Sequence, residues 1–217
     1  YMLRKIEKSI FLSKPILGIV PRLENNIHKI NKSLIDNITK CGGLCLGIIN
    51  EERYSYEFLD RDKLIIDNIL KICDGFVIPG GSTESFLDKY IIEYATKNNI
   101  PILGICLGMQ EMSSFLDLEE VSNHNKSNRY VHKVNIDKDS LLYKIFKKDI
   151  YVNSRHNYKI KNLNGYKVVG SCLDVIEAIE RDDNTFNVGV QWHPEDIDNE
   201  ELFDYFINST IIDKIFK

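Results

Sequence analysis

A cysteine lies between two glycines in the pentapeptide GICLG (104–108), after an apolar run and before a segment that can begin a helix. Glycines two positions either side of a nucleophile relieve crowding at a sharp strand-to-helix turn, which exposes the nucleophile at the edge of a sheet. The N-terminus of the following helix favours the thiolate, the reactive form of the side chain. The pattern predicts a nucleophilic Cys106; a core thiol between packing glycines is the alternative.

The apolar run VGVQW (188–192) is followed by the tripeptide His-Pro-Glu (193–195). A cysteine nucleophile needs a base to accept its proton, and the base needs a carboxylate to fix its tautomer. Pro194 stiffens the turn, so that Glu195 can fold back toward the imidazole of His193. A histidine at a strand end usually has a structural role, but the acid at this spacing favours catalysis. We expect a catalytic triad of Cys106, His193 and Glu195.

A glycine loop, IPGG (78–81), follows another apolar run. Backbone N–H groups exposed at such a loop can stabilise the oxyanion that develops during acyl transfer. We expect the oxyanion hole to consist of the N–H groups of Gly81 and Leu107, with Gly80 as a candidate for substrate binding. Because Pro-Gly-Gly is a common turn, this assignment depends on the triad.

Composition excludes several classes of protein. The chain of 217 residues has a net charge of −4 and scattered basic residues, which argues against nucleic-acid binding. No run approaches the roughly 20 apolar residues that a membrane-spanning helix needs. The five cysteines include no C-x-x-C pair, which indicates a reducing compartment and a cytoplasmic protein.

The histidines outside the His-Pro-Glu tripeptide show no spacing typical of metal ligands. His28 and His124 lie in polar stretches that indicate solvated surface, whereas His132 alternates on a strand and suits either the core or its rim. We therefore expect no metal and no cofactor.

The positions of the apolar runs indicate an α/β fold. Short runs that read as strands alternate with segments of helical period, which predicts βαβ crossovers and a mainly parallel central sheet flanked by helices. From about residue 130 the runs shorten and indicate additional antiparallel strands in the C-terminal half. Residues 117–129 are polar and predict a surface loop, and we expect one domain over 1–217. The expected strands are 16–20, 44–49, 74–81 and 102–106, and the expected helices 27–41, 61–72, 84–98 and 199–213.

The motifs P-G-G, G-I-C-L-G-M-Q and Q-W-H-P-E, in this order, resemble those of the class I glutamine amidotransferase superfamily over roughly residues 15–210. The resemblance implies its flavodoxin-like fold. It also implies that the cysteine is acylated by a γ-glutamyl group and that His193 and Glu195 complete the triad. Water or a tunnelled amine acceptor then resolves the thioester.

Three further stretches resemble the γ-glutamyl-γ-aminobutyrate hydrolase group, the C26 peptidases: KSLIDNITKCGGLCLGI, HKVNIDKDSLLYKIF and VNSRHNY. This likeness implies that Gln110, Ser154, Arg155 and His156 hold the α-amino and α-carboxylate groups of the substrate. Two departures from the pattern of the hydrolase group leave the identity of the amine leaving group undetermined. Leu107 stands where that group often has Arg and matches the amidotransferases proper, and Asn157-Tyr158 replaces the His-Gln that often follows.

These observations predict a cysteine-dependent hydrolase that cleaves a γ-glutamyl amide bond through a glutamyl thioester and releases glutamate and an amine. The alternative is a glutaminase subunit that supplies ammonia to a separate synthase partner. A third possibility, a catalytically silent binding protein, is disfavoured by the intact triad. We expect a small γ-glutamyl substrate, no nucleic acid and no membrane, and loops at 50–60 and 117–130 that select the amine.

Overall fold

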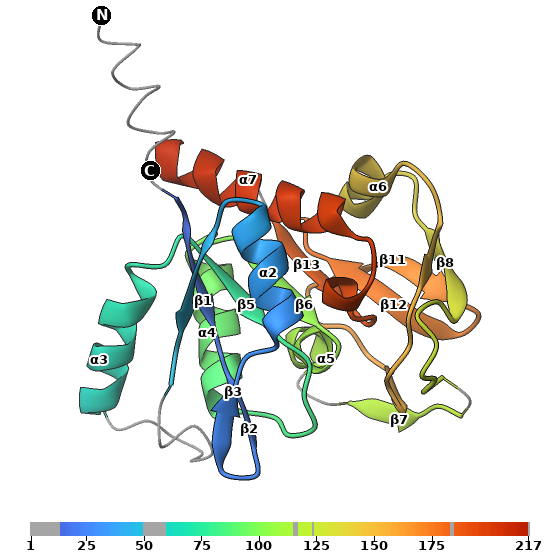
Figure 1. Ribbon diagram of the computed structural model, residues 1–217, viewed down its shortest axis with the longest axis horizontal. Coiled ribbons are helices and arrows are strands. Elements are labelled where there is room, and N and C mark those ends of the chain that lie inside the picture. The colour runs from blue at the N-terminus through green and yellow to red at the C-terminus, as the bar shows by residue number, and fades with distance from the viewer. Residues whose placement is uncertain (1–13, 50–59, 115–116, 123, 183–184, 217) are drawn as a thin grey trace, which may run out of the picture.

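The computed structural model describes residues 14–49, 60–114, 117–122, 124–182 and 185–216 (Figure 1). Within these residues a nine-stranded sheet has the order β4-β1-β5-β6-β13-β12-β11-β8-β9. The first five strands of this order pair in parallel and the remaining pairs are antiparallel. This arrangement confirms the predicted α/β fold with added antiparallel strands. The strands are β1 (Ile16–Ile19), β4 (Leu44–Gly47), β5 (Gly75–Ile78), β6 (Ile102–Ile105), β8 (His132–Ile136), β9 (Ile150–Val152), β11 (Lys167–Cys172), β12 (Val175–Glu180) and β13 (Asn187–Val190).

Helices cover both faces of the sheet (Figure 1). One apolar cluster joins α2 (Lys32–Lys40), α6 (Leu141–Phe146) and α7 (Glu200–Phe216) to the sheet through residues such as Leu34, Leu142 and Phe203. A second cluster joins α3 (Asp60–Leu70), α4 (Phe86–Lys97) and α5 (Leu107–Ser114) to the opposite face, through residues such as Leu87 and Met109. Burial on both faces explains why the parallel strands β5, β6 and β13 read as continuous apolar runs. No described helix is both long and apolar enough to cross a bilayer.

The helix predicted over 27–41 is wrong in its first part. Residues 22–29 form a hairpin of β2 (Arg22–Glu24) and β3 (Ile27–Lys29), and α2 begins only at Lys32. Asn25 and Asn26 have φ angles of 50° and 64°, the pair of positive values that a tight two-residue hairpin turn requires. Asn31 then caps α2, because its side chain accepts a hydrogen bond from the N–H of Ser33 at 3.2 Å.

The surface loop predicted over 117–129 is also wrong in part. It contains β7 (Leu118–Glu120), which pairs antiparallel with β10 (Tyr158–Ile160). Glu119 lies opposite Lys159 across this pair, so a polar sequence can form a strand through cross-strand charge pairing. The other predicted specificity loop, 50–60, lies outside the described residues except for Asp60, the first residue of α3.

Candidate active site

Cys106 occupies a sharp turn between β6 and α5 with a φ angle of 53°, in the left-handed region that non-glycine residues rarely adopt. Both neighbouring glycines are required by close packing. A Cβ on Gly108 would lie 2.0 Å from the carbonyl oxygen of Ile78, and one on Gly104 would lie 2.3 Å from the sulfur of Met112. The N–H of Cys106 donates to the carbonyl of Val190 at 2.8 Å, which continues the β6–β13 pairing into the turn. The chain is thus bent as the pentapeptide predicts.

His193 follows β13 and lies beside Cys106. A Cβ on Gly80 would lie 2.6 Å from Cε1 of His193 and 3.4 Å from Cβ of Cys106, so the glycine loop packs against both side chains. Nδ1 of His193 is 2.9 Å from Oε1 of Glu195, which lies on the short helix η1 (Pro194–Asp196). This bond fixes the ring and leaves Nε2 for the thiol. The structure therefore brings the three predicted triad residues together.

The charge on His193 is set by its two neighbours. Burial of the imidazole on its own lowers the pKa of His193, but hydrogen bonds with Cys106 and Glu195, together with their charge, outweigh burial and raise this pKa to about 10. A protonated imidazole beside the sulfur stabilises the thiolate. Burial instead raises the pKa of the Cys41 thiol to about 11 and that of Cys73 to about 12, which keeps both protonated. Among these thiols Cys106 alone has an activating partner.

Side chains that the sequence did not point to hold the backbone of the His-Pro-Glu turn. The amide of Asn153 accepts a hydrogen bond from the N–H of His193 at 2.8 Å and donates one to its carbonyl at 2.7 Å. Asn37 on α2 donates to the carbonyl of Glu195 at 3.2 Å. These contacts fix the imidazole from segments far away in sequence.

Arg22, on the β2–β3 hairpin, holds the glycine loop. Its guanidinium donates to the carbonyl of Pro79 and, at 3.1 Å, to the carbonyl of Gly80. Because C=O and N–H point in opposite directions across a trans peptide, fixing the Gly80 carbonyl on Arg22 turns the N–H of Gly81 to the other side. The N–H of Leu107 belongs to the first residue of α5 and has no partner within the helix. The arrangement supports the predicted pair of oxyanion donors.

Two buried carboxylates balance the charge of Arg22. The guanidinium pairs with Asp88 on α4 and lies 3.7 Å from Oε2 of Glu111 on α5. Burial and the charge of Asp88 raise the pKa of Glu111 well above its ordinary value, while the charge of Arg22 acts in the opposite direction. Removal of Arg22 would leave an uncompensated buried charge.

A cavity of about 480 Å³ opens over Cys106. Gln110, Arg155 and His156 line it together with Gly81 and Leu118. Their roles in substrate binding stay predictions.

The predicted substrate-binding residues differ in their surroundings. Gln110 is fixed, because its amide donates to Oε1 of Gln191 at 3.1 Å, while Arg155 is half-exposed and pairs with Asp196. Ser154 is fully buried and is not among the residues that line the cavity, which disfavours direct contact with substrate.

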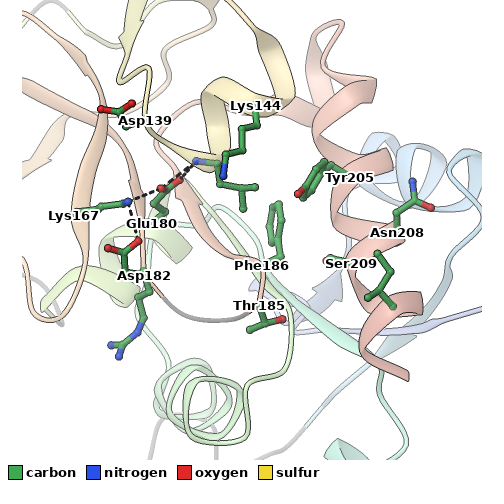
Figure 2. Close-up of a pocket in the computed structure, with 13 residues that line it drawn as sticks. Asp139, Lys144, Lys167, Glu180, Asp182, Thr185, Phe186, Tyr205, Asn208 and Ser209 are labelled. Carbon is green, nitrogen blue, oxygen red and sulfur yellow. Dashed lines mark hydrogen bonds and ion pairs between the residues drawn. The ribbon is translucent and has the colours of Figure 1, made fainter. Parts of the chain in front are cut away.

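A second cavity, of about 560 Å³, lies between β11, β12, α6 and α7 (Figure 2). Its charged groups neutralise one another: Lys167 lies 3.1 Å from Glu180 and 3.0 Å from Asp182. Glu180 also accepts the N–H of Leu141 at 3.0 Å, at the start of α6. The hydroxyl of Ser209 donates back to its own helix. The polar groups of this cavity serve the fold, and no activated nucleophile is among them.

Three residues of the triad turn, His193, Glu195 and Asp196, also offer ligand atoms within 4.8 Å of one another. Most of their atoms are engaged, however: Nδ1 of His193 bonds to Oε1 of Glu195, and Asp196 accepts hydrogen bonds from Ser33 at 2.7 Å and from Arg155. Oε2 of Glu195 is buried without a hydrogen-bond partner among the residues that the structure describes. This group of residues is organised as a hydrogen-bonded turn.

Comparisons with known proteins identify the family of the chain. The profile of the peptidase C26 family matches residues 85–195, just over half of the chain. CTP synthase of Thermosipho africanus is 31% identical over 209 residues, covering 76% of this chain and 39% of the synthase. The chain spans 36% and 35% of the CTP synthases of Clostridium kluyveri and Methanosphaera stadtmanae, so it corresponds to little more than a third of these curated relatives.

Solved structures with the same fold include a glutaminase domain and a protein named as a GMP synthase subunit. The glutaminase domain of Trypanosoma brucei CTPS with bound acivicin has a TM-score of 0.70 at 19% identity and covers 91% of this chain and 94% of that one. A GMP synthase subunit from Thermoplasma acidophilum has a TM-score of 0.67 at 19% identity, with 94% and 98% coverage. At this identity the likeness establishes the fold.

Proposed function

The chain belongs to the peptidase C26 family, within the class I glutamine amidotransferase superfamily, and we propose that it is a glutaminase that delivers ammonia to a separate synthase. The relatives support this choice over the free-standing γ-glutamyl hydrolase that the sequence analysis preferred, because they are named as CTP synthases and a GMP synthase subunit. The chain matches only a minor part of the CTP synthases, as a glutaminase component would.

The observation that carries the proposal is the contact of Cys106 with a protonated His193 at a strained turn. In the proposed reaction the thiolate attacks the γ-amide carbon of glutamine. The N–H groups of Gly81 and Leu107 bind the oxyanion. His193 donates its proton to the departing nitrogen, and ammonia leaves.

The second half of the reaction reverses the role of His193. The imidazole, now neutral, accepts a proton from water, which attacks the glutamyl thioester and releases glutamate and the Cys106 thiolate. Glu195 holds the ring and stabilises its charged form throughout, at the 2.9 Å contact with Nδ1. The residues of the site supply every proton transfer in this scheme.

A γ-glutamyl hydrolase with a larger amine leaving group is the second candidate. The C26 profile covers 85–195 and so includes the segment 152–158 that resembles the hydrolase group. Arg155, His156, Asn157 and Tyr158 of this segment line the cavity. The two candidates differ in the leaving group, which is ammonia for the glutaminase and a larger amine for the hydrolase.

The test is release of glutamate and ammonia from glutamine and from a panel of γ-glutamyl amines, with Cys106→Ala and, as the matched control, Cys45→Ala on β4. Glutamine turnover that Cys106→Ala abolishes and Cys45→Ala retains is the expected result. Hydroxylamine should also intercept the thioester as γ-glutamyl hydroxamate. Preference for one γ-glutamyl amine over glutamine would favour the second candidate. If the wild type cleaves nothing and forms no hydroxamate, either the catalytic assignment is wrong or the true substrate lies outside the panel.

A further inference from the structure

Three histidines and a glutamate converge away from the triad: His124, His132, His156 and Glu177, termed here the histidine cluster. They come from four parts of the fold, namely the segment between β7 and β8, β8 itself, the segment between β9 and β10, and β12. Of its members, His156 also lines the cavity over Cys106.

The atoms of the cluster point at one another. Oε1 of Glu177 lies 3.0 Å from Nε2 of His132, 3.6 Å from Nε2 of His124 and 3.8 Å from Nε2 of His156. Four ligands about 2.1 Å from a tetrahedral zinc ion lie about 3.4 Å from each other. The three separations bracket this value, and the ligand atoms of His124, His156 and Glu177 lie within 4.8 Å of one another, so these three residues can hold one ion. His132, whose Nε2 lies 3.0 Å from Oε1 of Glu177, stands beside this group.

The nitrogen and oxygen atoms that face one another in the cluster are buried, and in the described part of the chain they form ion-pair contacts but no well-aligned hydrogen bonds. His156 is 4% exposed and Glu177 is fully buried. Among the described residues the three Nε2 atoms and both carboxylate oxygens of Glu177 have no hydrogen-bond partner. Such groups are costly to bury unless something satisfies them, and a cation at the centre would satisfy the histidine nitrogens and the carboxylate at once.

Neighbouring backbone groups orient two of the ligand side chains, those of His156 and Glu177. Nδ1 of His156 lies 2.9 Å from the carbonyl of Tyr158, so Nδ1 carries the proton and Nε2 presents its lone pair. Glu177 lies at an irregularity of the β11–β12 pairing, where Ser171 pairs with Ile176 and the adjacent Gly170 pairs with Ala178. A bulge of this kind re-aims a side chain, here the carboxylate of Glu177.

We propose that the histidine cluster binds a single first-row transition-metal ion of the zinc type. Imidazole and carboxylate ligands suit zinc, whereas magnesium and calcium prefer sets of oxygen ligands. Cys172 offers a further ligand nearby, because its sulfur lies within 4.8 Å of a ring nitrogen of His124 and of His132; this group is separate from that of His124, His156 and Glu177. The ion ties β8 and β12 to the segment that carries Arg155 and His156, both of which line the cavity over Cys106.

The sequence expectation of no metal rested on the spacing of the histidines along the chain. The cluster draws its ligands from positions 124 to 177, and spacing cannot reveal ligands that only the fold brings together. The expectation that His124 is solvated surface is wrong, because its side chain is only 12% exposed and faces Glu177.

The test is zinc binding by the full chain after chelator treatment, measured by calorimetry and elemental analysis without substrate, and by the visible spectrum of the cobalt-substituted protein. The variants are His132→Asn and Glu177→Gln, with His28→Asn, on the exposed β2–β3 hairpin, as matched control. Cys106→Ala removes the competing thiolate. We expect one ion per chain in wild type, His28→Asn and Cys106→Ala, and at least about 100-fold weaker binding in His132→Asn and Glu177→Gln.

Equal zinc affinity in all these proteins, or loss of binding in Cys106→Ala alone, would overturn the proposal. Circular dichroism checks that the variants fold. If they do not, the wild-type cobalt spectrum decides: intense tetrahedral bands support the cluster, and a weak octahedral spectrum contradicts it. None of these measurements requires glutamine turnover. The zinc proposal can therefore be tested, and can succeed or fail, whether or not the protein hydrolyses glutamine.

Discussion

The triad and the histidine cluster use the same residue types in opposite ways. In the triad one imidazole is held between two partners, with Nδ1 on Glu195 at 2.9 Å and Cys106 on its other side. In the cluster three imidazoles aim Nε2 at one oxygen of Glu177. A single hydrogen-bonded ring can gain and lose a proton during a reaction, whereas several rings around one carboxylate are the arrangement that we propose to bind a metal ion. The two sites therefore differ in the number of imidazole rings that face one carboxylate: one ring in the triad and three in the cluster.

The largest expected change in activity comes from replacing Glu195, the carboxylate of the triad. Glu195→Gln should lower kcat for glutamine by roughly 10³ to 10⁴, because the amide no longer stabilises the imidazolium. Since Glu195 raises the pKa of His193 toward about 10, its loss should also move the alkaline limb of the kcat/KM profile to lower pH. The measurement is a pH–rate series. Glu177→Gln, the matching change in the cluster, should leave the alkaline limb of the kcat/KM profile unchanged. A shift of that limb in Glu177→Gln would contradict the separate roles of the two sites.

A smaller effect is expected at the glycine loop, which belongs to the triad alone. Arg22→Lys keeps the charge beside Asp88 but loses the fork that holds the carbonyls of Pro79 and Gly80. Misplacement of the Gly81 N–H should lower kcat by about 10- to 100-fold with little change in KM. Steady-state kinetics test this, with Arg129→Lys as control. An unchanged kcat, or a change in KM alone, would remove Arg22 from the positioning of the oxyanion hole.

The smallest effect concerns the segment between the two regions. Arg155→Ala should raise KM for glutamine about tenfold and leave kcat within a few-fold, because the guanidinium is predicted to bind the substrate carboxylate. Titration of initial rates separates the two parameters. Lys126→Ala provides a nearby loss of charge outside the cavity lining. If both variants behave alike, Arg155 acts through general electrostatics and the substrate carboxylate binds elsewhere.

The proximity of Cys106, His193 and Glu195 could be predicted because its signals are local. A strand, a glycine-flanked cysteine and a histidine two residues before a glutamate each occupy a few adjacent positions, and parallel strands bring their ends to one edge of the sheet. Alternation of apolar runs with helical segments likewise predicted the sheet, because β5, β6 and β13 are buried on both faces.

The missed features depend on contacts between distant segments. Arg22 reaches the carbonyl of Pro79 57 residues away, and only after the Asn25–Asn26 turn folds the hairpin. His124 lies in a polar stretch that reads as surface, yet β8 and β12 enclose it with Glu177. Residue type and local pattern carry no information about such partners.

The segment 153–156 contacts both regions at three of its four residues: Asn153 holds the backbone of His193, Arg155 pairs with Asp196, and His156 belongs to the cluster. Any ligand that shifts this segment changes the free energy of both sites, and such coupling is reciprocal. Zinc and glutamine are then linked ligands. The factor by which zinc changes the equilibrium affinity of the Cys106→Ala protein for glutamine must equal the factor by which glutamine changes its affinity for zinc.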